Sequence, residues 1–475
     1  MLRAFYGLII VATLLLAACG TTPDPTPDPI RPDREEPLEP PEPLFDPTEE
    51  AYESISLALA MGDPERAINA FEDAQLADPD SPETQVLLAN LYLTAGALDD
   101  AARILENVLQ DYPDNEQALF ALALLTGHRG DRAQAQDLLE RLVEVNPEQA
   151  QAQAALGELR LRNRRYGPAE NAFAASLAQE PDNLVALVGM GNLKLRTDEP
   201  AAAERFLDRA VETAPDFPFA YADRSRARAL QRKFGEAEAD LQRAIELDEE
   251  FLWHYYDRGK VRLERNNPAG AVEDFNRVIA KDPSIFLTYV YRARAFDLLQ
   301  EREQAVADYR TALELRPDYH PGMAPLAVLL LELGRYGEAA DRFAAAFREQ
   351  NPNDPPDRGL ALLSALSRKL AGEEAEARRY LERNAREFSG SGLYADMARY
   401  YISPGSDAYI YRQVSRESDK QLRIRMSFFL AGQYEVLGRN SSARALYREV
   451  LDENLRGLVE TRLARDRLER LQGVP

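Results

Sequence analysis

Few residues in this chain have the type and spacing that catalysis requires. The three histidines, His128, His254 and His320, are too scattered to form a metal cluster, and Cys19 is the only cysteine. The sequence contains no nucleophile elbow, no phosphate-binding glycine loop and no metal-ligand spacing. We therefore expect no enzymatic activity, no cofactor, no metal and no small-molecule substrate. An enzyme hidden in residues 404–475 is a weaker hypothesis, because no polar residues converge there.

Residues suited to binding, in contrast, recur at one spacing. Three cations, Arg226, Lys260 and Arg294, follow one another at intervals of 34 residues in an otherwise acidic chain. An apolar and aromatic series accompanies them, made up of Val185, Val188, Phe219, Trp253, Tyr256, Leu287 and Val290. Aromatic residues and arginine are the types that dominate protein-binding hot spots. These ten residues are therefore of the types that suit an acidic and apolar partner, and the family resemblance described below implies that they form a candidate binding site.

The same interval organises most of the chain. Alanine occupies every thirty-fourth position from Ala67 to Ala339. Twelve residues after most of these alanines comes a proline, at Pro79, Pro113, Pro147, Pro181, Pro215, Pro283 and Pro317. Small residues allow two antiparallel helices to approach closely, and a proline ends the second helix. A period of 34 with these features is typical of a helix-turn-helix solenoid.

This pattern resembles the tetratricopeptide repeat (TPR). Taking the proline as position 32 defines nine repeats over residues 48–353, the first being 48–81 and the last 320–353. The resemblance implies an all-α, right-handed superhelical solenoid of antiparallel helix hairpins. It also implies that positions 2, 5, 9, 12 and 13 of each repeat face a concave groove in which other proteins or peptides bind.

All ten candidate residues fall at positions 2, 5 and 9 of repeats five to eight, so the resemblance places them in the groove. A second interpretation remains open at this point. The aromatic residues could pack between repeats, and the three cations could pair with acids on neighbouring helices. The arginines at position 7, Arg224, Arg258 and Arg292, are expected to point towards the helix pair and form internal salt bridges.

Beyond Pro352 the repeat loses its phase. We expect residues 354–403 to form a degenerate TPR-like hairpin and a loop. Residues 404–475 are expected to form a further TPR-like hairpin and a capping helix. Capping units with a polar outer face are a general requirement of solenoids.

The first residues predict an export signal. A short positive start and an apolar run end at Leu16-Ala17-Ala18-Cys19, which resembles the lipobox of bacterial lipoproteins. That resemblance implies a signal peptide over 1–18 and lipidation at Cys19. An ordinary signal peptide with a chance cysteine is the alternative. Residues 19–47 would then be the acylated cysteine and a proline-rich tether with too few apolar residues to form a core.

Charge narrows the classes of partner. Acidic residues outnumber basic ones by 80 to 57, which gives a formal charge of −23 and disfavours binding to nucleic acid. We expect a non-catalytic, membrane-anchored TPR adaptor lipoprotein of the bacterial cell envelope, which binds protein partners in its groove. By analogy with lipoprotein sorting, Gly20 favours the outer membrane, facing the periplasm. The alternative is a surface-displayed adhesin that binds a host or matrix ligand.

Overall fold

The computed structural model describes residues 47–74, 80–349, 357–390, 392–453, 455 and 457–473. The described residues form helices and connecting turns, and no strand occurs among them. The predicted signal peptide, Cys19 and the tether up to residue 46 lie outside these ranges. By its internal contacts the chain divides into two units, Met1–Gln231 and Arg232–Pro475.

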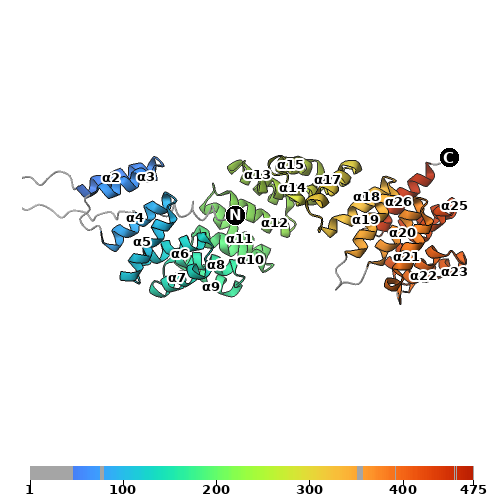
Figure 1. Cartoon of the computed structure of the whole chain (residues 1–475), viewed down its shortest axis with the longest axis horizontal. Coiled ribbons are helices and arrows are strands. Elements are labelled where there is room, and N and C mark those ends of the chain that lie inside the picture. Colours follow the sequence, from blue (N-terminus) through green and yellow to red (C-terminus); the bar gives the residue numbers. More distant parts are fainter. Residues whose placement is uncertain are drawn as a thin grey trace, which may run out of the picture. The chain divides into compact units, whose positions relative to one another are not determined.

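The first unit consists of paired antiparallel helices (Figure 1). Its helices are α2 (Pro47–Ala60), α3 (Pro64–Asp73), α4 (Pro82–Thr94), α5 (Leu98–Asp111), α6 (Glu116–Arg129), α7 (Arg132–Val145), α8 (Ala150–Arg162), α9 (Tyr166–Gln179), α10 (Leu184–Arg196), α11 (Pro200–Thr213) and α12 (Pro218–Leu230). Even-numbered helices are the first helices of the repeats, and odd-numbered helices are the second.

The second unit continues the same alternation and then departs from it. It begins with α13 (Phe234–Leu247), α14 (Leu252–Glu264), α15 (Pro268–Lys281), α16 (Phe286–Leu298), α17 (Arg302–Leu315), the short 3-10 helix η1 (His320–Gly322), α18 (Met323–Glu332) and α19 (Tyr336–Arg348). It ends with α20 (Arg358–Leu370), α21 (Glu374–Arg383), η2 (Ala385–Phe388), α22 (Leu393–Ile402), α23 (Asp407–Ser415), α24 (Lys420–Val436), α25 (Asn440–Asp452) and α26 (Val459–Gln472).

Close packing inside a repeat explains the alternation of small and large residues. In repeat four, a Cβ atom added to Gly157 at position 8 would lie 2.6 Å from the ring of Phe173 at position 24. In repeat seven, the same atom added to Gly259 would lie 2.7 Å from the ring of Phe275. Both rings are fully buried. The small residue thus makes room for the large one, which confirms the predicted all-α hairpin solenoid at the level of side chains.

The turn between the two helices of a repeat requires one left-handed residue at position 15. Gly62, Gly96, Gly130 and Gly334 occupy it with φ between 72° and 92°. In the other five repeats of the 48–353 array a residue with a side chain takes the same conformation, at Arg164, Asp198, Arg232, Asn266 and Gln300, with φ of 60–64°. Such residues pay a steric cost that glycine avoids.

The turn after the second helix does not depend on proline alone. Repeat six has no proline at position 32, and there the Asp248 carboxylate accepts hydrogen bonds from the backbone N–H groups of Glu250 and Phe251, each at 3.2 Å. Repeat seven has Pro283 and still uses Asp282 in the same way towards Ser284. An aspartate side chain that bonds the backbone two residues on is a common turn device, so the missing proline leaves the turn intact.

The structure corrects the prediction of a loop within 354–403. Residues 393–402 form α22, and α23 follows after the short loop 403–406. Leu393, Met397 and Tyr401, spaced by four residues, are buried on one face of α22. The serine- and glycine-rich segments on both sides of this helix conceal its short apolar pattern in the sequence.

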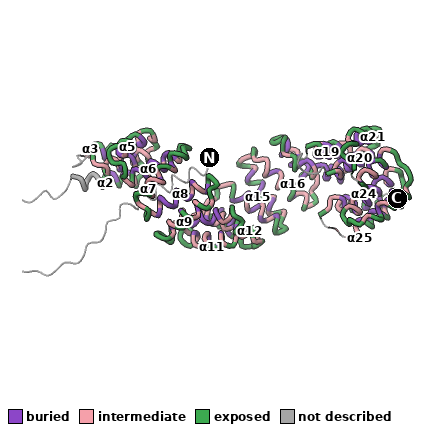
Figure 2. Tube along the Cα trace, turned by 90° about the horizontal axis from the view of Figure 1, so that it is seen from below, coloured by how far each residue is buried: buried purple, intermediate pink, exposed green. Residues whose placement is uncertain are grey.

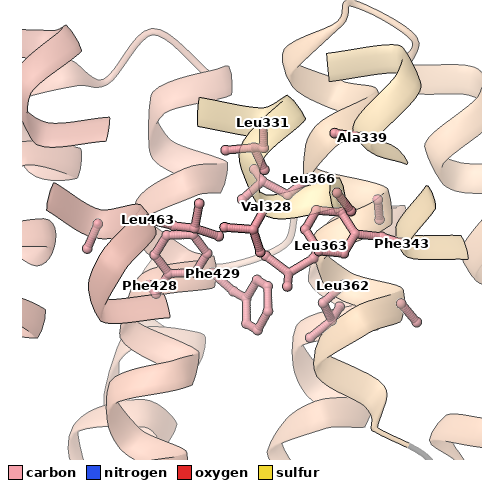
Figure 3. Packing of buried hydrophobic residues seen from close by; sticks show 14 of the residues in the cluster. Val328, Leu331, Ala339, Phe343, Leu362, Leu363, Leu366, Phe428, Phe429 and Leu463 are labelled. Atoms are coloured by element: carbon pink, nitrogen blue, oxygen red, sulfur yellow. The ribbon is translucent and has the colours of Figure 1, made fainter. Parts of the chain in front are cut away.

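The hydrophobic core also changes character along the second unit. Elsewhere, small clusters of buried residues join neighbouring repeats, whereas one large cluster extends from Ala293 to Leu471. Figure 2 shows the buried stretches inside the C-terminal helices, and Figure 3 shows the close packing of their side chains. Val328, at position 9 of repeat nine, which would face a groove, is buried here, and the later helices α20 and α24 bury Leu362, Leu366 and Phe428. In this region α20 packs on α24, and α18 packs on α26.

Candidate functional site

The inner wall of the second unit is the face of α14, α16 and α18 that carries positions 2, 5, 9, 12 and 13. On α14 the aromatic residue at position 2, Trp253, keeps 38% of its surface exposed. Its ring lies edge-on to Tyr256, with ring centroids 5.4 Å apart. The ammonium group of Lys260 lies 5.3 Å from the Tyr256 ring centroid and 6.0 Å from that of Tyr291. Trp253 and Lys260 thus both contact Tyr256, and Trp253 is the exposed ring of this group.

The cations of this wall are paired, but only weakly. Lys260 lies 3.2 Å from Asp257, three residues earlier on the same helix. Arg294 on α16 lies 3.3 Å from Glu264 on α14. All four side chains are substantially exposed to solvent, and exposed ion pairs contribute on the order of 0–1 kcal/mol. Either cation can therefore exchange its partner for a carboxylate of a ligand at little cost.

Three of the predicted residues in this unit contribute to packing rather than to an exposed surface. Tyr256 is buried, and burial raises the pKa of its hydroxyl. Leu287 packs against the cluster around Phe275, and Val290 packs against the large C-terminal cluster. The interpretation that aromatic residues fill the space between repeats thus describes Tyr256, while Trp253 remains accessible.

Two tyrosines of the same region were not singled out from the sequence. Tyr291 lies 5.7 Å from Tyr256 and stacks with Phe275 at 6.0 Å. Tyr319 lies 5.1 Å from Phe286, between centroids. They occupy positions 6 and 34, which the groove pattern does not include. The only sequence signal was the local richness of repeats seven and eight in tyrosine.

In the first unit the predicted residues lie on α10 and α12. Val185 and Val188 are half-buried and pack against separate clusters of their own unit. Phe219 is half-buried beside Phe217, with ring centroids 5.5 Å apart. Arg226 is exposed and pairs with no carboxylate among the described residues. It is therefore available to an acidic ligand.

Beneath the wall, the arginines at position 7 form internal ion pairs, as predicted. Arg258 donates to the buried Asp274 at 2.6 Å, and Arg262 donates to the same carboxylate at 3.0 Å. Arg292 pairs with Asp308 at 2.7 Å, and Arg224 pairs with Asp208 at 3.0 Å. The arginines are largely shielded from solvent. They stabilise the helix pairs and are not available to a ligand.

Burial decides the state of the one histidine near the wall. His254 is buried beside Phe251, with ring centroids 4.6 Å apart. Burial lowers its pKa to about 4, although Asp248 and Asp257 act in the opposite direction. The imidazole is therefore neutral at pH 7 and adds no charge to the wall. Within the described ranges, no group of three or more His, Cys, Asp or Glu side chains is placed to hold a metal ion.

Together, the stacked hairpins and the exposed residues on their first helices define an all-α repeat protein of the kind that binds other proteins. Tetratricopeptide repeat sequence models match residues 58–125, 93–159 and 160–232, and a further one matches residues 256–320. These matches cover about half of the sequence. The chain belongs to the tetratricopeptide repeat family. TPR proteins are typically non-catalytic and bind proteins or peptides.

Similar solved structures are shorter repeat proteins. A tetratricopeptide repeat protein from Parabacteroides merdae ATCC 43184 is 21% identical, with a TM-score of 0.41 over 53% of this chain and 99% of that one. PilW, a widely conserved type IV pilus biogenesis factor, is 21% identical, with a TM-score of 0.40 over 42% and 94% of the chains. MamA is 23% identical, with a TM-score of 0.34 over 36% and 93%. No curated protein matches the sequence. In the part of the chain that the structure describes, no helix is long and apolar enough to cross a membrane.

Proposed function

We propose that this protein is a membrane-anchored scaffold lipoprotein of the bacterial cell envelope that binds an acidic, apolar segment of a partner protein on its inner wall. The observation that carries the proposal is the exposed Trp253 on α14, which shares this wall with two exposed cations, Lys260 on the same helix and Arg294 on α16. Each cation is held by one exposed carboxylate, so a ligand carboxylate can replace it. The tryptophan ring offers the apolar contact that such a ligand needs.

The charge of the chain makes this site specific. A protein with a net charge of −23 repels an acidic partner over most of its surface. An acidic partner is attracted only where cations lie close together and the neighbouring carboxylates are already paired. Lys260 and Arg294, both in the second unit, are such cations. Electrostatic attraction of this kind mainly raises the association rate and selects the partner.

The binding experiment uses the full-length protein and the emission of Trp253, the only tryptophan of the chain. A partner captured from the native envelope is purified and titrated. We expect the emission to shift on binding, and we expect Lys260→Glu combined with Arg294→Glu to weaken binding at least tenfold while helicity is unchanged. The matched control is Lys281→Glu combined with Arg310→Glu. These two cations are exposed on second helices and are also paired with single carboxylates, of Glu250 and Glu338. Equal losses in both double variants would refute the proposed site.

The anchor is tested separately. Leu16-Ala17-Ala18-Cys19 supports acylation at Cys19, and lipoprotein acylation adds the several chains that stable anchoring requires. A tether of this composition reaches about 3.1 Å per residue when extended, so residues 19–47 could span roughly 80–90 Å. We expect Cys19→Ser to release the protein from membranes. Retention of this variant after a salt wash would contradict the anchor, and proteolysis of intact cells would distinguish periplasmic from surface display.

A further inference from the structure

The helix α26 contacts repeats that are distant from it in sequence. Arg462 donates hydrogen bonds to both carboxylate oxygens of Asp297, at 2.6 and 2.7 Å. It also donates to both carboxylate oxygens of Glu332, at 2.6 Å each, across 130 residues of sequence. Asp297 stands at position 12 of repeat eight, and Glu332 stands at position 13 of repeat nine. One arginine of α26 therefore bridges α16 and α18 at inner-wall positions.

Two further arginines of α26 extend this contact. Arg467 donates to the hydroxyl of Tyr336 at 2.7 Å and pairs with Glu435. Arg470 donates to the backbone carbonyl of Glu332. The side chain of Glu332 is only 2% exposed, and its other cationic partner is Arg302 at 3.1 Å. Loss of Arg462 would leave much of the charge of a buried carboxylate uncompensated.

Apolar contacts accompany the charges along one face of α26. Leu463 and Ala464 are fully buried, and Leu463 belongs to the same cluster as Val328 and Leu331 of α18. Figure 3 shows these leucines and Val328 within that cluster. Val328 stands at position 9, where Lys260 and Arg294 stand in repeats seven and eight. The wall position that is open in those repeats is thus covered in repeat nine.

The two wall segments meet on a single helix. Arg294, at the open site, and Asp297, under α26, are three residues apart on α16. A ligand that follows the wall from α14 towards α18 therefore reaches α26. Arg462 remains 38% exposed and Asp297 remains 23% exposed, so a competing guanidinium group can approach Asp297 from solvent, whereas Glu332 is only 2% exposed. The opposite face of α26, with Arg465 and Glu469, is exposed.

We infer that α26 is a displaceable occupant of the inner wall, which covers repeats eight and nine until an arginine-bearing amphipathic helix of a partner protein takes its place. The carboxylates of Asp297 and Glu332 select the arginine, and Val328 and Leu331 accept the apolar face. This second segment of wall favours a basic helix, whereas the segment at Trp253 favours an acidic ligand. The inference rests on the proposed function only in treating the inner wall as the binding surface.

The probe is a fluorescein-labelled synthetic peptide with the sequence of residues 458–473, titrated against the full-length protein. Wild type should bind it weakly, because its own α26 occupies the wall. The Arg462→Glu protein should bind it at least tenfold more tightly, and a peptide carrying the same substitution should bind neither protein. The control Arg465→Glu, on the exposed face of α26, should behave as wild type. Circular dichroism establishes that each variant keeps its helicity.

A second variant keeps the test decisive if Arg462→Glu impairs folding. Asp297→Arg should bind the substituted peptide, whose glutamate then meets an arginine, more tightly than the unsubstituted peptide. Equal peptide affinity for wild type and Arg462→Glu, or no change of peptide preference in Asp297→Arg, would overturn the inference. The Lys260→Glu and Arg294→Glu double variant should leave peptide binding unchanged. A failure at that site would therefore refute the proposed function without touching this one.

Discussion

Replacing Gly259 by alanine tests the packing that places the inner wall. The new Cβ atom would lie 2.7 Å from Cε1 of Phe275, whereas carbon atoms normally pack at about 3.5–4.0 Å. The Phe275 ring is fully buried and stacks with Tyr291 at 6.0 Å, so it has little room to retreat. Overpacking of this kind costs about 1–3 kcal/mol. Alanine regains up to about 1 kcal/mol because it favours the helix over glycine, so the net loss should be about 1 kcal/mol.

Urea unfolding followed by circular dichroism measures the effect. With a slope of about 1–3 kcal/mol per molar, the midpoint of the second unit should fall by roughly 0.5 M. The control is Gly235→Ala near the start of α13, where a Cβ would meet no atom within 4 Å. It should leave the midpoint unchanged or raise it slightly. Equal midpoints for the two variants would refute the assigned contact between positions 8 and 24.

Three further predictions concern the backbone, a buried ion pair and pH. Arg164→Gly should raise the free energy of unfolding by about 1 kcal/mol, because φ is +60° there and glycine avoids the steric cost; the opposite change, Gly130→Arg, should lower it in the same urea assay. Arg258→Met should destabilise by about 1.5–3 kcal/mol, because it removes one of the two guanidinium partners of the buried Asp274 and leaves Arg262, and adding Asp274→Leu should recover part of that loss. Burial lowers the pKa of His254 to about 4 from 6.5, so the unfolded chain binds the proton first. The contribution of the neutral, buried imidazole to the free energy of unfolding is therefore fully present above pH 6.5, and it falls by about 3 kcal/mol as the pH drops to 4. The His254→Gln variant should lose this part of the dependence of the unfolding free energy on pH.

The sequence predicts most of the fold because each repeat is a local unit. The alanine at position 20 and the large residue at position 24 pack against helices of the same or the neighbouring hairpin. Their repetition every 34 residues is therefore enough to predict the fold. Backbone conformation at position 15 was only partly visible, since glycine marks it in four repeats while Arg164 or Gln300 gives no such signal. The helix α22 escaped prediction because its apolar pattern is short and is bounded by serine and glycine.

The sequence predicts on which helices the candidate residues lie better than it predicts which of them are exposed to solvent. Trp253, Lys260 and Arg294 lie on first helices near the exposed surface, but Tyr256 is buried against its neighbours. Whether a residue at a groove position is exposed depends on whether another helix of the chain covers it. The contact of Arg462 with Glu332 joins residues 130 positions apart, and no local period encodes such a pairing. That these residues bind a partner stays a prediction.

Site-specific cross-linking tests the central claim, that the inner wall at α14 and α16 binds the partner, most directly. A photoreactive residue is placed at position 253, and in a second protein at position 281 on α15, and both full-length proteins are irradiated in the native envelope. The account predicts a cross-linked partner from position 253 that disappears when Lys260 and Arg294 are changed to glutamate, and none from position 281. The same partner recovered equally from both positions, or a cross-link at position 253 that survives the charge reversal, would contradict it.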